Sequence, residues 1–317
     1  MTLLRISYFR VYHPEFDAQG SGYKVLWLNV TSQRWLTDAD VSRSIWYHWV
    51  AVIVPNNLNP DFSGNALLWI GGGKNDATPP GIWDKELIVC AALAQEIGAI
   101  VASVYTIPNQ PMVYYEEPSG RGRSEDAMIA WAWAHYIRDP SNPEWLPRLP
   151  MTKASIRAMD AVTEFWSIKS GPTLAKWVVA GASKRGWTTW TVGACDPKRV
   201  IGIIPMVLDE LDFVSNIKHH FRAYGGWSFA LDDYYKVNFT ANLDHPNVAK
   251  MMSIVDPINY VDILTMPKLI LSTAGDEFLL PDNNDWYWSK LQGEKVKQKI
   301  ILLITSLLRS LLLNDLT

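Results

Sequence analysis

The sequence is short of cysteines, of basic charge and of metal-binding motifs, and each shortage excludes a class of protein. Two cysteines occur in 317 residues, Cys90 and Cys195, and they form no CxxC or zinc-type pair. We expect two buried thiols, because a free cysteine usually behaves as a small hydrophobic residue. The 29 basic and 32 acidic side chains give a formal net charge of −3, which excludes the clustered positive charge of a nucleic-acid-binding domain. Metal-ligand spacings, a P-loop and a dinucleotide fingerprint are missing, so we expect no metal and no cofactor.

The end of the chain lacks residue types that are common elsewhere. No histidine follows His245 and no aromatic residue follows Trp288, although the chain has six histidines and 16 tryptophans. Residues 295–317 carry an apolar run that is shorter and more polar than the ~20 apolar residues a bilayer requires, so we expect no membrane span. The run predicts either a C-terminal amphipathic helix or an end that is foreign to the protein. We therefore divide the chain into a domain at 1–294 and an atypical tail at 295–317.

Short apolar runs alternate with amphipathic helical stretches along most of the chain. The predicted strands are 23–30, 46–54, 66–70, 99–105, 176–180, 200–207 and 268–273. The predicted helices are 82–97, 124–137, 152–166, 184–194 and 210–221. This alternation is typical of a mostly parallel sheet flanked by helices on both faces. The span 223–259 is aromatic and polar and fits the alternation poorly, so we expect a lid inserted between sheet elements.

The strongest motif for chemistry is GASKRG at 181–186, between a predicted strand and a predicted helix. A nucleophile elbow places a serine in a tight, strained turn of this kind, with small residues on either side of it. The pattern here is G-x-S-x-x-G, because Arg185 occupies the usual position of the second glycine. An ordinary cap by Ser183 at a strand-to-helix junction is the alternative interpretation.

Two further segments would complete a hydrolase site. Gly71-Gly72-Gly73 follows a predicted strand, and glycines let backbone N–H groups face a developing oxyanion. The N–H groups of Gly72 and Gly73, with that of Lys184 directly after the serine, are the expected oxyanion hole. Asp276 follows the last predicted strand, where the acid of a Ser…Asp…His order belongs.

Other acids and histidines leave alternatives open. Asp209 and Glu210 follow a predicted strand, so they could supply the acid or cap the next helix. His219, His220 and His245 could supply a base, because a triad is defined by geometry and not by chain order. Positions on the surface, in the lid or in the core are the other interpretation of these histidines.

The cations and tryptophans near the motif also have two interpretations. Lys184 and Arg185 could favour an anionic substrate, or they could bind nearby carboxylates. We expect most tryptophans in the core. Trp187 and Trp227 are the ones that could line a site for a sugar ring or another bulky ligand.

Several long blocks of the sequence are similar to one known family. They are VTSQRWL at 30–36, WYHWVAVIVP at 46–55, LLWIGGGKN at 67–75, GASKRGWTTW at 181–190 and STAGDEFLLPDN at 272–283. These blocks resemble the PhoPQ-activated pathogenicity-related family, from roughly Gly22 to Glu294. The resemblance implies an α/β-hydrolase fold, often behind a secretory signal, and an inferred hydrolase activity. It also implies that Ser183 is the elbow serine and Asp276 the acid.

The sequence departs from the family's pattern after the acid. A histidine should follow Asp276 by a few tens of residues, and none does. Without that base Ser183 is a weak nucleophile at neutral pH. The first hypothesis is therefore a serine hydrolase for an ester or amide bond, impaired in this chain, whose substrate is a small molecule, a carbohydrate or a peptide.

The second hypothesis is a non-enzymatic, secreted signalling or binding protein that uses the hydrolase fold to recognise a cell-surface partner. Fold alone does not decide between the two hypotheses. The resemblance implies export from the cell. Arg5 and Arg10 interrupt the apolar N-terminus, however, so the sequence predicts no signal peptide and the cytoplasm is the alternative location.

Overall fold

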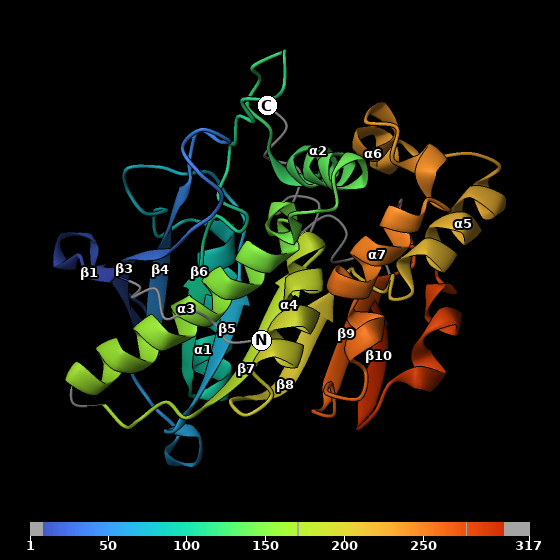
Figure 1. Ribbon diagram of the computed structural model, residues 1–317. Coiled ribbons are helices and arrows are strands. Elements are labelled where there is room, and N and C mark those ends of the chain that lie inside the picture. The colour runs from blue at the N-terminus through green and yellow to red at the C-terminus, as the bar shows by residue number, and fades with distance from the viewer. Residues whose placement is uncertain (1–8, 170, 277, 301–317) are drawn as a thin grey trace. The chain divides into compact units, whose positions relative to one another are not determined.

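The computed structural model describes residues 9–169, 171–276 and 278–300 (Figure 1). The chain forms two compact units. The first comprises Met1–Gly122 and Pro150–Val178, and the second comprises Arg123–Leu149 and Val179–Thr317. Each unit contains strands of a mixed sheet with helices beside them.

The first unit contains the antiparallel part of the fold. Its strands are β1 (Phe9–Tyr12), β2 (Ala18–Gly20), β3 (Tyr23–Arg34), β4 (Ile45–Pro55), β5 (Asn65–Ile70) and β6 (Ile100–Val104). They lie in the order β1-β3-β4-β6-β5, and β2 pairs with β3. All of these pairs are antiparallel except β5–β6, which is parallel. The helices of this unit are α1 (Lys85–Ile97) and all but the start of α3 (Arg148–Ile168).

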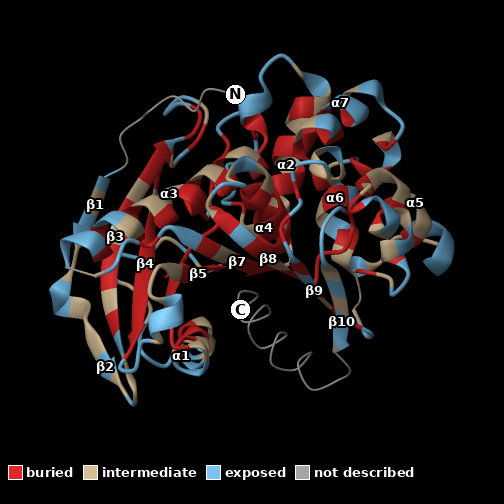
Figure 2. Ribbon diagram, turned by 90° about the horizontal axis from the view of Figure 1, so that it is seen from below, coloured by how far each residue is buried: buried red, intermediate tan, exposed pale blue. Residues whose placement is uncertain are grey.

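Strands β4 and β6 carry the core of the first unit, because most of their side chains are buried. Figure 2 shows this for β4. Both strands are rich in valine and isoleucine, which pack well on a pleated, buried surface. Helix α1 begins after Asp84, whose side chain accepts the N–H of Leu87 at 2.9 Å. It ends at Gly98, which has a φ of 68°. These caps fix the position of α1 after the glycine triplet 71–73.

The second unit contains the parallel part of the fold. Its strands are β7 (Lys176–Ala182), which begins in the first unit, β8 (Val200–Met206), β9 (Lys268–Thr273) and β10 (Lys295–Ile300). They lie in the order β7-β8-β9-β10, and the β8–β9 and β9–β10 pairs are parallel. Its helices are α2 (Glu125–Arg138), α4 (Lys184–Cys195), α5 (Phe213–Tyr224), α6 (Asp232–Lys236) and α7 (Pro246–Val255).

The predicted strands and helices are all present, with the starts of three helices displaced: α1 begins three residues later than predicted, α3 four residues earlier and α5 three residues later. The predicted helix at 210–221 begins only at Phe213, because Asp212 adopts a left-handed conformation with a φ of 59° and precedes the first turn. Asp209 and Glu210 therefore lie before the helix, and the prediction that they cap it is wrong. The sequence pattern also missed the strands β1, β2 and β10.

Residues 223–259, the predicted lid, form α6, α7 and short 3-10 turns that pack on α2. The ring of Trp133 on α2 lies 5.5 Å from that of Tyr234 and 5.2 Å from that of Phe239. The side-chain amide of Asn247 donates to the carbonyl of Ile137 at 2.8 Å. These residues are called the insertion below, and their role as a lid stays a prediction.

The first residues of the predicted tail form a strand, not a helix. Strand β10 pairs with β9 in unbroken register from Lys295 to Ile300. Lys297 on β10 contacts the carboxylate of Asp209 at 2.6 Å and the side-chain oxygen of Asn284 at 2.7 Å. Residues 301–317 lie outside the described residues, so a division at residue 294 stays a prediction. Among the described helices, none is long and apolar enough to cross a bilayer.

The prediction of two buried cysteines is half right, and the prediction that most tryptophans lie in the core is confirmed. Cys90 is buried, but Cys195 is exposed because it is the last residue of α4. Eleven of the 16 tryptophans are buried. Six of these are among the largest fully buried side chains: Trp27, Trp46, Trp133, Trp177, Trp187 and Trp190.

Candidate active site

Ser183 lies in a strained turn between β7 and α4. Its φ of 55° and ψ of −126° are unfavourable for a residue with a side chain and cost about 1–3 kcal/mol. The turn is held because the N–H of Ser183 donates to the carbonyl of Met206 at 2.9 Å. The side chain makes no capping hydrogen bond to α4. The turn therefore has the conformation of a nucleophile elbow rather than that of an ordinary serine cap.

Two glycines allow this turn to form. A Cβ on Gly181 would lie 2.7 Å from the carbonyl oxygen of Arg185, and a Cβ on Gly186 would lie 2.8 Å from that of Met206. Both neighbours are backbone atoms, which cannot move without displacing the strand or the helix. The close approach to β8 falls on position 186, so position 185 is free to carry an arginine. This explains why the motif reads G-x-S-x-x-G.

Lys184 and Arg185 bind carboxylates at the start of α2. The Lys184 ammonium lies 2.6 Å from Glu125 and 3.0 Å from Asp126, and Arg185 donates to both oxygens of Glu125. Burial raises the pKa of Glu125, but the nearby guanidinium and ammonium groups more than offset it and hold that pKa below its ordinary value. Both cations are thus neutralised within the fold, which favours the carboxylate interpretation over recognition of an anionic substrate.

Asp276 follows β9 at the same edge of the sheet as Ser183. The carboxyl end of β8 lies between them, because Ser183 bonds to Met206 and the N–H of Val207 donates to the carbonyl of Leu271 at 2.7 Å. The Asp276 carboxylate accepts the backbone N–H groups of Phe278 and Leu279 at 2.8 and 2.9 Å. These bonds fix the carboxylate at the end of the strand.

The alternative acids, Asp209 and Glu210, are deeply buried after β8. Asp209 is 1% exposed and is paired with Lys297, and burial raises its pKa nonetheless. Glu210 is 4% exposed, and burial, with the carboxylates of Asp209 and Asp276, raises its pKa well above the ordinary value. An acid that orients a histidine must be ionised. The raised pKa therefore argues against Glu210 in this role.

His220 contacts the loop that follows Asp276. Its Nδ1 lies 3.2 Å from the carbonyl of Phe278, and its Nε2 accepts the N–H of Ser228 at 3.3 Å. This pair of bonds places the proton on Nδ1, and burial lowers the pKa of the ring. His220 is thus a buried, neutral histidine whose two nitrogens are both occupied by backbone groups.

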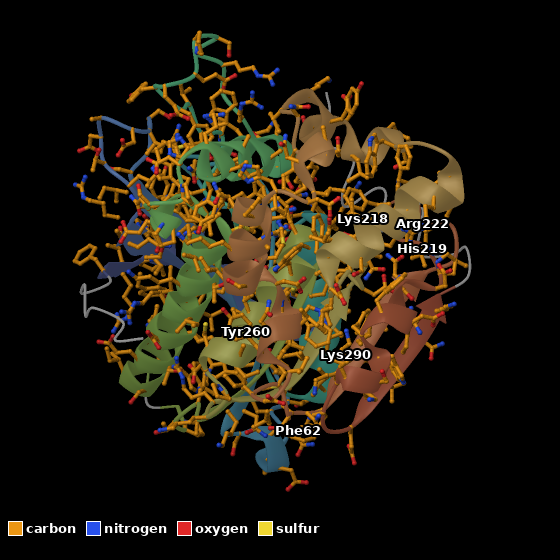
Figure 3. All side chains as sticks on the ribbon, turned by 45° about the vertical axis from the view of Figure 1, so that its right-hand side comes forward. Phe62, Lys218, His219, Arg222, Tyr260 and Lys290 are labelled. Carbon is orange, nitrogen blue, oxygen red and sulfur yellow. The ribbon has the colours of Figure 1, made fainter. Side chains whose placement is uncertain are left out.

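The other two candidate histidines have structural contacts. His219 lies 2.9 Å from the carboxylate of Asp282, and Figure 3 shows it on α5 with Lys218 and Arg222. His245 caps α7, because its Nδ1 accepts the N–H of Asn247. Within the described part of the second unit, no hydrogen bond joins the Ser183 hydroxyl to His219, His220 or His245.

The glycine triplet lies in the first unit, at the end of β5. Gly71 continues the strand through its N–H, which donates to Val104 at 2.8 Å. The N–H of Gly72 donates to the Glu86 carboxylate at 3.2 Å. Gly73 has a φ of 99°, which favours glycine. The expected donor Gly72 is thus bound to an acid of α1, and its role, like that of Gly73, stays a prediction.

Two acidic residues and one arginine that no sequence pattern indicated also surround the elbow. Glu125 and Asp126 bind Lys184, and Arg148 donates to the carbonyl of Lys184 at 2.8 Å. Acidic residues in the first turn of a helix are a known pattern for dipole compensation, and this pattern concealed their contacts with residues about 60 positions away. Trp187 is 2% exposed and its indole N–H donates to Val255, so it is a core residue and does not line an open site.

No metal site accompanies these groups in the described residues, where no three histidine, cysteine or acidic side chains form a cluster suited to a metal ion. The groups after β7, β8 and β9 are a serine hydroxyl, carboxylates and backbone N–H groups.

Solved structures with similar folds are esterases. An acetyl xylan esterase from a Paenibacillus species has a TM-score of 0.60 at 14% identity, with 92% of this chain and 81% of that chain covered. Acetyl xylan esterase 1 from a Thermoanaerobacterium species has a TM-score of 0.56 at 14% identity, covering 98% and 89%. The rice cell wall degrading esterase LipA from Xanthomonas oryzae has a TM-score of 0.52 at 11% identity, covering 93% and 92%. The expected α/β-hydrolase fold is confirmed, with a mostly parallel mixed sheet flanked by helices.

Sequence comparison identifies a family within this fold. Autocrine proliferation repressor protein A from Dictyostelium discoideum is 39% identical over 272 residues, which cover 85% of this chain and 53% of the relative. The chain thus spans about half the length of that relative. The family model described as PhoPQ-activated pathogenicity-related protein matches residues 11–300. On this match, the chain belongs to the PhoPQ-activated pathogenicity-related protein family.

Proposed function

We propose that this chain is a serine hydrolase of ester or amide bonds, with Ser183 as the nucleophile. The observation that carries the proposal is the strained conformation of Ser183, with a φ of 55°, between two glycines at which an added Cβ would lie under 3 Å from backbone atoms. A protein maintains such strain mainly where it serves a function. In this proposal Asp276 is the acid, and the backbone N–H of Lys184 is one oxyanion donor.

We further propose that turnover is impaired in this chain. No histidine follows Asp276 in the sequence, and each candidate histidine in the second unit is held by other groups. A serine without a general base is a weak nucleophile, and a hydrolase that lacks one triad member retains only the catalysis given by the oxyanion hole and substrate binding. Bond cleavage would then be slow rather than absent.

Labelling with a fluorophosphonate, followed by peptide mass spectrometry, tests the identity of the nucleophile. The phosphonyl group is expected on Ser183 and on no other residue, and Ser183→Ala is expected to abolish it. Ser155, a buried hydroxyl that donates to the carbonyl of Met151, gives a matched control, because Ser155→Ala should leave the labelling unchanged. Labelling that persists in Ser183→Ala would remove Ser183 from the proposal.

The proposed substrate class is an ester of a carbohydrate or of another small molecule. The supporting observation is at the level of fold, because the similar structures carry the names acetyl xylan esterase and cell wall degrading esterase. A panel of acetylated sugars, aryl esters and peptide amides tests this class. Cleavage of amides alone would contradict it.

The second candidate is a secreted signalling protein that does not use catalysis. The supporting observation is the 39% identity to a relative named autocrine proliferation repressor protein A. Export from the cell belongs to this candidate as a proposal. Adding purified Ser183→Ala protein to proliferating cells separates the two functions, because unchanged repression would favour signalling and lost repression would favour catalysis.

A further inference from the structure

Asp126, on the first turn of α2, joins two elements that are distant in the sequence. One carboxylate oxygen lies 3.0 Å from the ammonium of Lys184, the residue directly after the elbow serine. The other oxygen accepts the hydroxyl proton of Tyr234 on α6, at 3.1 Å. A single side chain therefore contacts both the nucleophile elbow and the insertion.

Lys184 is held in place at both its side chain and its main chain. Its ammonium is bound by Glu125 and Asp126, and its carbonyl accepts hydrogen bonds from Arg148 at 2.8 Å and from Thr188 at 3.1 Å. The residue is only 7% exposed. The side chain and the main chain of Lys184 are therefore both held by residues of α2, α3 and α4.

Asp126 has two roles in this cluster. Glu125 lies 2.6 Å from the ammonium of Lys184 but also binds Arg185, so Asp126 supplies the second negative charge for the two buried cations. Asp126 also makes the bond to the insertion. Its second oxygen is used by Tyr234, whose ring packs 5.5 Å from Trp133 and 5.8 Å from Phe239.

Tyr234 is suited to hold this bond. It is 4% exposed, and burial, together with the Asp126 carboxylate, raises the pKa of its hydroxyl well above the ordinary value. The hydroxyl therefore remains a donor over the whole working pH range. The bond to Asp126 exists only while α6 is packed against α2.

We propose that Asp126 is a positioning residue that couples the packing of the insertion on α2 to the backbone of the nucleophile elbow at Lys184. The proposal rests on the proposed function, because it assigns regulation to the same site. When Tyr234 donates to Asp126, the Lys184 ammonium is held by two carboxylates and the turn is fixed. When the insertion separates from α2, Asp126 loses this partner and its ion pair with Lys184 is held less rigidly.

Hydrogen exchange of the full chain tests the coupling without any need for activity. Tyr234→Phe removes one oxygen atom, and amide exchange in the elbow peptide 181–190 is expected to rise about fivefold, as for the loss of one hydrogen bond. Exchange in strand β9 serves as the reference and should not change. Tyr235→Phe is the matched control, because the neighbouring tyrosine on α6 is 61% exposed. Equal effects of the two substitutions, or equal rises in 181–190 and in β9, would overturn the proposal.

A double-mutant cycle separates positioning from mere packing. In Asp126→Asn the amide oxygen can still accept the tyrosine hydroxyl, but the link to the Lys184 ammonium is weakened. Tyr234→Phe should therefore add little to elbow exchange in this background, whereas additive effects would contradict coupling through Asp126. The rate of Ser183 labelling by a fluorophosphonate should fall in the same non-additive way. If no variant is labelled, the proposed function fails, while the exchange data still decide the coupling.

Discussion

Two glycine-containing turns each have a glutamate beside them, and the two turns are built differently. At the elbow, Gly181 and Gly186 face backbone oxygens, and Glu125 binds the cations at 184 and 185. At the triplet, a Cβ on Gly71 would lie 2.1 Å from a carboxylate oxygen of Glu86, and the same side chain accepts the N–H of Gly72. The glycines of the elbow are therefore required by the backbone, and Gly71 is required mainly by a side chain.

This difference predicts how each turn tolerates change. A backbone neighbour cannot move away from an added methyl group, but the end of a glutamate can. A carboxylate bound to buried cations also contributes more to stability than one bound to a single amide.

Removal of the elbow glutamate should have the largest effect. Glu125→Ala leaves Lys184 and Arg185 buried with only part of their counter-charge, which we expect to lower the free energy of unfolding by about 3 kcal/mol. Urea unfolding at neutral pH measures it, and Glu96→Ala on the exposed face of α1 is the control. A loss below about 0.5 kcal/mol, the usual range for surface substitutions, would mean that the ion pairs contribute nothing net.

The contribution of Glu125 to the free energy of unfolding should depend on pH. The pKa of Glu125 is lower in the folded chain than its ordinary value of 4.5, so the unfolded chain takes up a proton first as the pH falls. The contribution of Glu125 is therefore fully present above pH 4.5 and is lost as the pH falls through the folded pKa. The stability difference between the wild-type chain and Glu125→Ala should shrink in the same direction.

An added methyl group at the elbow should have the second largest effect. In Gly186→Ala the new Cβ meets the carbonyl oxygen of Met206 at 2.8 Å and Cβ of Leu208 at 3.0 Å, so the helix must shift, at a cost of about 2 kcal/mol. Gly226→Ala, where no atom lies within 4 Å of the added Cβ, is the control. Equal unfolding midpoints for the two variants would break the comparison.

Adding a methyl group at the glycine triplet should have a smaller effect. A second substitution should remove about half of that effect. Gly71→Ala is expected to cost about 1 kcal/mol, because Glu86 can rotate away while the carbonyl of Val104, at 3.1 Å, stays in place. In a Glu86→Ala background the same change should cost about half as much. A cost that is unchanged by Glu86→Ala would show that the backbone restricts this turn as well.

The sequence was sufficient to find the elbow but not the residues that hold it. The elbow is a local pattern, in which a buried strand, a glycine-flanked serine and a helix follow one another, and strand β9 was predicted with its observed bounds for the same reason. The ion pairs of Lys184 and Arg185 join residues about 60 positions apart. No local periodicity reports such a contact, so the partner carboxylates remained unidentified.

The remaining errors have separate physical causes. The short strands β1 and β2 lie at the edge of the first unit's sheet. Their extended conformation comes from hydrogen bonding to β3, because their own sequences have no clear strand pattern. The start of α5 was misplaced because Asp212 adopts a left-handed conformation, and an aspartate in a helical pattern gives no sign of it. Strand β10 was concealed within a segment whose composition differs from the rest of the chain.

The decisive measurement is the rate at which Ser183 reacts with a fluorophosphonate, with and without added imidazole. If turnover is impaired as we propose, the serine should react slowly alone. Imidazole supplied in solution should then raise the rate on the order of tenfold or more, because it would provide general-base assistance. Ser183→Ala should show neither reaction. Rapid labelling without imidazole, or no acceleration when imidazole is present, would contradict an intact elbow that lacks only its base.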